Sequence, residues 1–116
     1  MLQSKNILIV DANIYQTIDL SGAIEAVEGR VAGVVTTVEE VADVLKTCIV
    51  HGAVIDCQLP EASAVVMLLH EQDVAMVLQV GPAVPEPLRA LDGKVSILPR
   101  PAACETVLNA LSEKLS

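Results

Sequence analysis

Two acidic residues, each at the end of a short apolar run, are the clearest candidates for chemistry in this chain. Asp11 follows the run from Asn6 to Val10, and Asp56 follows Ala53-Val54-Ile55. Each run is typical of a buried strand, and the carboxyl ends of parallel strands meet at the edge where open α/β sheets bind ligands. We therefore expect the two carboxylates to face each other across one crevice. An acid in that place binds a ligand or caps the turn that follows it.

The composition indicates one folded domain over residues 1–116. Apolar residues make up 53% of the 116 residues, and Tyr15 is the single aromatic. The net charge of −8 disfavours nucleic acid or an anionic membrane as a direct partner, because neither supplies counter-charge. No apolar run approaches the ~18 residues that span a bilayer. The first five residues lack the pattern of a signal peptide, so a cytoplasmic location is expected.

The cysteines and histidines give no pattern of a metal site. Cys48, Cys57 and Cys104 are odd in number and widely spaced, which is typical of reduced thiols in a cytoplasmic protein. Strand alternation turns Cys57 away from the Asp56 side chain, so a packed thiol is expected there. His51 and His70 are expected at the surface, near helix ends.

Apolar runs and helical stripes alternate along the whole chain. The spacing predicts strands at 6–10, 31–35, 53–56, 74–80 and 95–98, with helices at 13–27, 38–49, 62–69 and from 104 to 115 and a short, less regular one between 82 and 93. Thr37 to Glu40 has the form of a capping box before the second helix.

The helical stripes predict which side chains are buried. Ile14 and Ile18 extend the stripe of the first helix, and Ile49 closes that of the second. In the third helix, Val66 and Met67 fall off the stripe and are candidates for an exposed apolar patch.

This order predicts a flavodoxin-like, doubly wound three-layer sandwich. Five strands and about five helices imply right-handed βαβ units and a five-stranded parallel sheet of order 2-1-3-4-5. The switch point lies between the first and third strands, whose ends are Asp11 and Asp56.

Over essentially its whole length, the sequence resembles the CheY-like receiver domains of bacterial two-component response regulators. The matching pieces, in chain order, are Ile7-Leu8-Ile9-Val10-Asp11, then Val54-Ile55-Asp56-Cys57-Gln58-Leu59-Pro60, then Leu98-Pro99-Arg100-Pro101. The resemblance implies that Asp56 accepts a phosphoryl group from a histidine kinase. It also implies that Mg²⁺ is held by Asp11, Asp56 and the main-chain carbonyl of Gln58.

The sequence departs from the family pattern around the retained Asp56. The second acid after the first strand is Ala12, and the phosphoryl-contacting lysine is Arg100. The hydroxyl position is Val80, or Gln79 if the register is one residue earlier, and the aromatic switch position is Ile97. The third helix is also several residues shorter than is usual. Mg²⁺ binding is therefore expected to be weak or absent.

Arg100 carries the sharpest structural hypothesis. A guanidinium keeps the charge of a lysine, but it is planar and reaches further. Placed between Asp56 and Asp11, it would stand in for the missing metal and hold the site closed.

Three functions follow from these observations. The first is a receiver domain of a two-component phosphorelay, with no output domain in this chain and no activity beyond Mg²⁺-assisted self-phosphorylation and dephosphorylation. It would work through contact with a histidine kinase or other signalling protein, or as a homodimer through the region from Val84 to Ser116. The second is a pseudo-receiver that binds its partner without phosphorylation. The third, a flavodoxin-like cofactor-binding enzyme, needs a glycine-rich cradle that Asp11-Ala12-Asn13 does not supply.

Overall fold

The computed structural model describes residues 1–82, 88 and 90–115. In chain order its elements are β1 (Asn6–Val10), α1 (Ile14–Ala26), β2 (Arg30–Val35), α2 (Val38–Thr47), β3 (Gly52–Asp56), α3 (Ala62–Glu71), β4 (Ala75–Val80), β5 (Val95–Pro99) and α5 (Cys104–Leu115). The additional helix expected between 82 and 93 falls largely on residues 83–87 and 89, which lie outside the described part of the chain.

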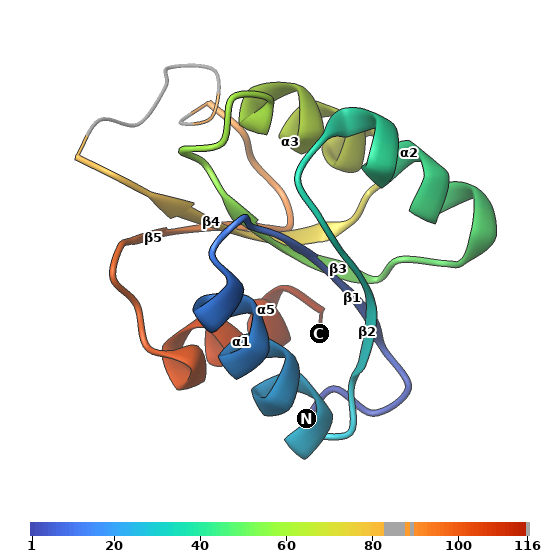
Figure 1. Ribbon diagram of the computed structural model, residues 1–116, viewed down its shortest axis with the longest axis vertical. Helices are drawn as coiled ribbons and strands as arrows, with labels where there is room; N and C mark the ends of the chain where they lie inside the picture. The colour runs from blue at the N-terminus through green and yellow to red at the C-terminus, as the bar shows by residue number, and fades with distance from the viewer. Residues whose placement is uncertain (83–87, 89, 116) are drawn as a thin grey trace.

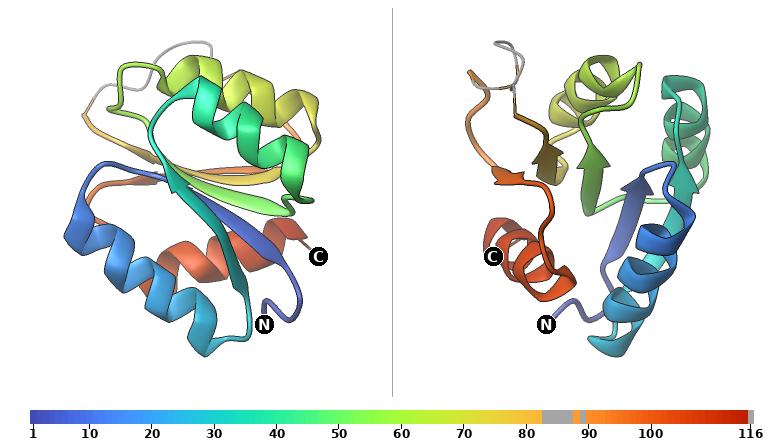
Figure 2. Two further views of the ribbon diagram at one scale, coloured as in Figure 1. Left: turned by 45° about the vertical axis from the view of Figure 1, so that its right-hand side comes forward. Right: turned by 60° about the vertical axis from the view of Figure 1, so that its left-hand side comes forward.

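The five strands form one parallel sheet of order β2-β1-β3-β4-β5, as the sequence predicts. Helices α1 and α5 cover one face of this sheet and α2 and α3 cover the other, so the molecule has three layers (Figures 1 and 2). The β1–β3 pairing sets Val10 opposite Ile55, and the β3–β4 pairing sets Asp56 opposite Gln79. Register alone therefore aligns the ends of three neighbouring strands. None of the helices described is long and apolar enough to cross a membrane.

Strand alternation divides the buried side chains between two cores. Ile7 and Ile9 of β1 pack toward α1 and α5, whereas Leu8 and Val10 pack toward α2 and α3. The last four residues of β1 and all six of β4 are buried, because both faces of the sheet are covered. Val54 lies in the α1–α5 core and its neighbours Ala53 and Ile55 lie in the other.

Side chains at their N-termini explain where α1 and α2 begin. The Asn13 side chain accepts a hydrogen bond from the Gln16 amide, and the Thr37 hydroxyl accepts one from the Glu40 amide. The Glu40 carboxylate in turn accepts from the amide of Thr36 at 3.1 Å. This backbone hydrogen bond, with those from the threonine hydroxyls, lowers the pKa of Glu40. The capping box thus reaches back one residue further than the sequence pattern predicts.

Three side chains predicted to be buried are exposed. Ile14 and Ile18 are 65% and 62% exposed, because α1 buries a narrower stripe of Thr17, Leu20 and Ile24. Ile49 is 75% exposed, since α2 ends at Thr47 and the chain beyond it turns extended.

Val66, predicted to lie off the buried stripe of its helix, is fully buried, because α3 packs deeply enough onto the sheet to enclose two adjacent residues, Val65 and Val66. Met67 is 41% exposed, as expected.

The histidines are partly buried rather than free at the surface. His51 lies next to β3, and its Nδ1 accepts a hydrogen bond from the Asn6 amide at 2.9 Å. The Nε2 of His70 lies 3.2 Å from the carbonyl oxygen of Asp92. Each imidazole therefore contacts the main chain of a segment distant in sequence, at Asn6 and at Asp92.

The cap of α2 gives a direct test of local stability. Thr37→Ala removes the hydroxyl that accepts from Glu40, and it should lower the free energy of unfolding by ~1 kcal/mol in urea titrations. Thr47→Ala is the matched control at the other end of α2, because the Thr47 hydroxyl bonds back to the carbonyl oxygens of Val44 and Asp43 within the helix. Equal losses in the two variants would contradict the capping role.

Candidate functional site

Asp11, Asp56 and Gln79 meet at the carboxyl edge of the sheet. Asp11 continues β1 next to Asp56 of β3, and Asp56 is opposite Gln79 of β4. Alternation from Val10, Ile55 and the strand residues before Gln79 turns all three side chains toward the face that carries α1 and α5. The parallel order of the sheet thus brings together side chains from positions 11, 56 and 79.

Both acids are held by the chain immediately after them. The Oδ1 of Asp11 accepts a hydrogen bond from the Asn13 amide at 2.8 Å, and the Oδ1 of Asp56 accepts one from the Gln58 amide at 2.9 Å. The Asp11 side chain is 5% exposed and that of Asp56 is 14% exposed. Two nearly enclosed carboxylates therefore lie at one edge, and they need a counter-charge.

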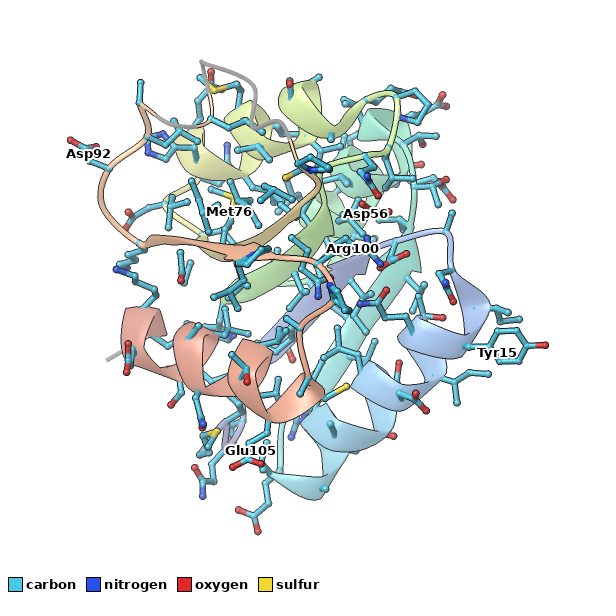
Figure 3. The ribbon with its side chains drawn as sticks, turned by 90° about the vertical axis from the view of Figure 1, so that its left-hand side faces the viewer. Tyr15, Asp56, Met76, Asp92, Arg100 and Glu105 are labelled. Carbon is cyan, nitrogen blue, oxygen red and sulfur yellow. The ribbon has the colours of Figure 1, made fainter. Side chains whose placement is uncertain are left out.

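Arg100 supplies that counter-charge from the connection between β5 and α5. Its Nη1 lies 2.7 Å from Asp56 Oδ1, and its Nη2 lies 3.7 Å from Asp11 Oδ2. Figure 3 shows the Asp56 and Arg100 side chains close together above α1, whereas Tyr15 projects outward from it. The contact with Asp56 is an ion pair without hydrogen-bond geometry, since Nη1 has no hydrogen-bond partner among the described residues. The predicted pairing of Arg100 with the acids is present.

A main-chain hydrogen bond fixes the backbone of Arg100. The Arg100 amide donates to the carbonyl oxygen of Val80 at 2.9 Å, and the peptide bond to Pro101 is cis. The side chain therefore starts from the end of the sheet and crosses back over β4 toward the two acids. An open hollow of about 400 Å³ lies beside it, lined by residues of α1 and of the β5–α5 connection that include Asn13, Gln16 and Ala102.

Two glutamines extend the charged cluster into the protein. Arg100 Nη2 donates to Gln16 Oε1, and Gln16 Nε2 donates to Gln79 Oε1 at 3.3 Å. Gln79 is 1% exposed, and its Nε2 has no hydrogen-bond partner among the described residues. The acids, the guanidinium and both amides thus form one connected chain.

Sequence reasoning missed Gln16 and gave Gln79 only as an alternative position. Neither amide belongs to a motif. The available signal was positional, because Gln16 lies in the first turn of a helix that begins three residues after Asp11.

The residues present do not fit a magnesium site. Among the described residues, no group of three His, Cys, Asp or Glu side chains is placed to hold a metal ion. Asp11 and Asp56 are the two carboxylates at this edge, and Ala12 supplies no third. A metal ion that bridges the two acids would need free carboxylate oxygens. The guanidinium of Arg100 already contacts an oxygen of each acid.

The remaining predicted positions surround the acids without joining the cluster. Val80 is 4% exposed and packs in the α2–α3 core, whereas Gln79 lies on the face of the acids. Ile97 is 37% exposed on the edge strand β5. The Gln58 side chain lies over Gly81, where an added Cβ would come within 2.6 Å of its Nε2.

Cys57 packs against the α2–α3 core, as alternation predicts, and is half-buried. Burial, with the charge of Asp56, raises its pKa to about 11, although Arg100 opposes the shift. The neutral thiol is therefore the form that the fold favours.

Solved structures with a similar fold include response regulator receiver domains. SdrG from Sphingomonas melonis Fr1 is 23% identical, with both chains fully covered and a TM-score of 0.76. A response regulator receiver protein from Sinorhizobium medicae WSM419 is 20% identical over 97% of this chain and 94% of its own, with a TM-score of 0.80. The REC domain of the PhyR response regulator from Erythrobacter litoralis is 21% identical over 97% and 91%, with a TM-score of 0.77.

The chain has the receiver-domain fold. No protein-family model matches the sequence, and no curated protein is significantly similar to it. At these identities the likeness to the solved structures establishes the fold alone.

The buried ion pairs of this receiver fold should dominate its electrostatic stability. Arg100→Ala leaves Asp11 and Asp56 without a counter-charge, so it should cost about 3 kcal/mol of unfolding free energy. Lys94→Ala is the control, because Lys94 pairs with Asp73 at 3.2 Å on the exposed surface and should cost less than about 1 kcal/mol. In an Asp56→Asn background the loss from Arg100→Ala should shrink; an unchanged loss would contradict the pairing.

The raised pKa of Cys57 predicts a pH-dependent reactivity. A thiol with a pKa near 11 stays protonated at neutral pH. As pH is raised, its alkylation rate should therefore begin to increase at a pH about two units higher than in the urea-unfolded chain. The ordinary value is 9.0, so the neutral thiol contributes stability below pH 9 that is lost as pH rises toward 11. Mass mapping after iodoacetamide treatment measures the rate; a folded-state rise near pH 9 would contradict the shift.

Proposed function

We propose that this chain is a signal-transduction receiver domain with Asp56 as its phosphoacceptor, acting through contact with other signalling proteins. The observation that carries the proposal is the place of Asp56, an acid at the carboxyl end of the central strand with a cation 2.7 Å away. The receiver-domain fold supports the signalling class, and the position of Asp56 at the switch point supports the residue.

The transfer would use residues already in place. A carboxylate oxygen of Asp56 attacks phosphorus of the donor, the bond from phosphorus to the leaving group breaks, and the leaving group departs with the electron pair. The product is an acyl phosphate on Asp56. Approach of the two anions is unfavourable, and the Arg100 guanidinium offers a fixed positive charge with planar donors that match a phosphoryl group.

The response to phosphorylation would have to pass through Arg100. Val80 has no hydroxyl to bond a phosphoryl oxygen, and Ile97 has no ring to change orientation. Arg100 is bonded to Val80 through its main chain and to Gln16 through its side chain, so its displacement would reach both β4 and α1.

A histidine kinase or another signalling protein is the expected partner. The homodimer surface predicted for 84–116 falls in part on 84–87, 89 and 116, which lie outside the described residues, so it stays a prediction.

A second candidate is a pseudo-receiver that binds its partner without phosphorylation. The ion pairs of Arg100 favour it, because they engage both acids in the unmodified protein. Ala12 and Val80 favour it too, since they remove a metal ligand and the reporting hydroxyl. Both candidates keep the domain in signalling, and they differ in whether Asp56 is modified.

A phosphodonor assay separates the candidates. Incubation with acetyl phosphate should add one phosphoryl group, acid-stable and base-labile, detected by intact-protein mass and lost in Asp56→Asn. Asp73→Asn is the matched control, because Asp73 is an exposed acid outside the site.

A beryllium fluoride titration followed by amide NMR gives the second readout. SdrG, 22% identical, has a solved structure in a BeF3-activated conformation, so the mimic acts on one protein of this fold. Shifts confined to the residues around Asp56 and Arg100 would support the phosphoacceptor. No mass gain and no shift with the mimic would overturn it and leave the pseudo-receiver.

A further inference from the structure

We infer that Arg100 is the resident cation of this site: it takes the place of a divalent metal between Asp11 and Asp56, and Gln16 and Gln79 position it there. The inference rests on the proposed function only in taking Asp56 as the centre of the site. It applies whether or not Asp56 is phosphorylated. It assigns to the two glutamines a role that no motif gives them.

The first step is the coordination of the two carboxylates. Each acid already accepts a hydrogen bond from the amide two residues along the chain and forms an ion pair with the guanidinium of Arg100. Mg²⁺ requires near-octahedral oxygen ligands and gives up its own water reluctantly. At this edge it would find contacts already made by both oxygens of Asp11 and by Oδ1 of Asp56, and an arginine whose charge repels it.

The second step is what keeps the guanidinium in place. An arginine side chain has many rotamers, and holding one of them costs conformational entropy. Here Nη2 is bonded to Gln16 Oε1, and Gln16 is bonded through its Nε2 to Gln79 Oε1. Because a guanidinium only donates, Gln16 must turn its oxygen toward Arg100, which leaves its NH₂ group for Gln79. The direction of each amide follows from the charge at the acids.

The third step is the energetic cost of burying the Gln79 side-chain amide. Gln79, near the carboxyl end of β4, is 1% exposed, and its Nε2 donates to no described residue. Burying a donor without a hydrogen-bond partner is unfavourable, and a leucine of similar size would avoid that cost. A polar residue kept at such a cost indicates a role beyond packing. The contact it makes, with Gln16, indicates that this role is to orient the amide that holds Arg100.

Manganese binding measured by NMR tests the inference. Mn²⁺ replaces Mg²⁺ at oxygen sites and broadens nearby amide signals, so those of Asn13 and Gln58 report on the two acids directly. The wild-type protein should show no saturable broadening at these amides at millimolar Mn²⁺. Arg100→Ala should bind Mn²⁺ at least about tenfold more tightly, with competition by Mg²⁺.

Further variants separate position from charge. Gln79→Leu keeps the arginine but removes the amide that orients Gln16, and it should give an intermediate gain in Mn²⁺ affinity. Arg100→Lys keeps the charge, loses the planar donors, and should also fall between the wild-type protein and Arg100→Ala. Lys94→Ala makes the same change in net charge as Arg100→Ala outside the site and should leave Mn²⁺ affinity at the wild-type level. If Arg100→Ala does not fold without metal, the two milder variants carry the test.

Two outcomes would overturn the inference. One is saturable broadening of Asn13 and Gln58 in the wild-type protein. The other is a set of folded Arg100 and Gln79 variants with wild-type affinity. The acetyl phosphate reaction in the presence of EDTA is read separately, so a failure of Asp56 to accept a phosphoryl group leaves the metal-binding result intact.

Discussion

The structure depends on a problem that parallel pairing creates: two carboxylates, from β1 and β3, are set side by side with little access to water. Asp11 and Asp56 are 5% and 14% exposed, and each would pay a large desolvation cost if it stayed ionised alone. In this protein the cation comes from the chain itself. Arg100 follows the edge strand β5, and its side chain reaches both acids. Its main-chain amide is hydrogen-bonded to the end of β4. The negative charges of the two acids are thus compensated by a side chain whose position the strand order determines.

The rest of the molecule makes that arrangement rigid. Strand alternation sorts apolar side chains into two cores, one under α1 and α5 and one under α2 and α3. The polar chain of Arg100, Gln16 and Gln79 lies at the upper edge of the first core, where α1 begins. Since β4 is buried along its whole length, Gln79 has no route to solvent, and its direction is fixed by its neighbours. Packing and polar contacts therefore constrain the same few side chains.

The fold and the central acids could be predicted from the sequence because periodicity and strand ends carry them. The sheet order, the approach of Asp11 to Asp56 and the pairing of Arg100 with them follow from one topology. Residues whose placement depends on helix rotation were predicted less well: Ile14 and Ile18 are exposed and Val66 is buried, since a stripe does not give the depth of packing. Gln16 was missed because an amide has no motif, and its role exists only once β4 and the β5–α5 connection are beside it.

The absence of a side chain at Gly81 gives the loops after β3 and β4 a shared space. The amide end of Gln58 lies so close to Gly81 that a Cβ at residue 81 would be 2.6 Å from its Nε2. Gln58 also holds Asp56 through its main-chain amide. The peptide that follows Asp56 is therefore linked to the end of β4 in two ways: the Cys57 amide donates to the carbonyl oxygen of Gln79 at 2.9 Å, and the Gln58 side chain lies against Gly81. Neither contact needs a hydroxyl, so the ends of β3 and β4 are coupled although Val80 carries an apolar side chain.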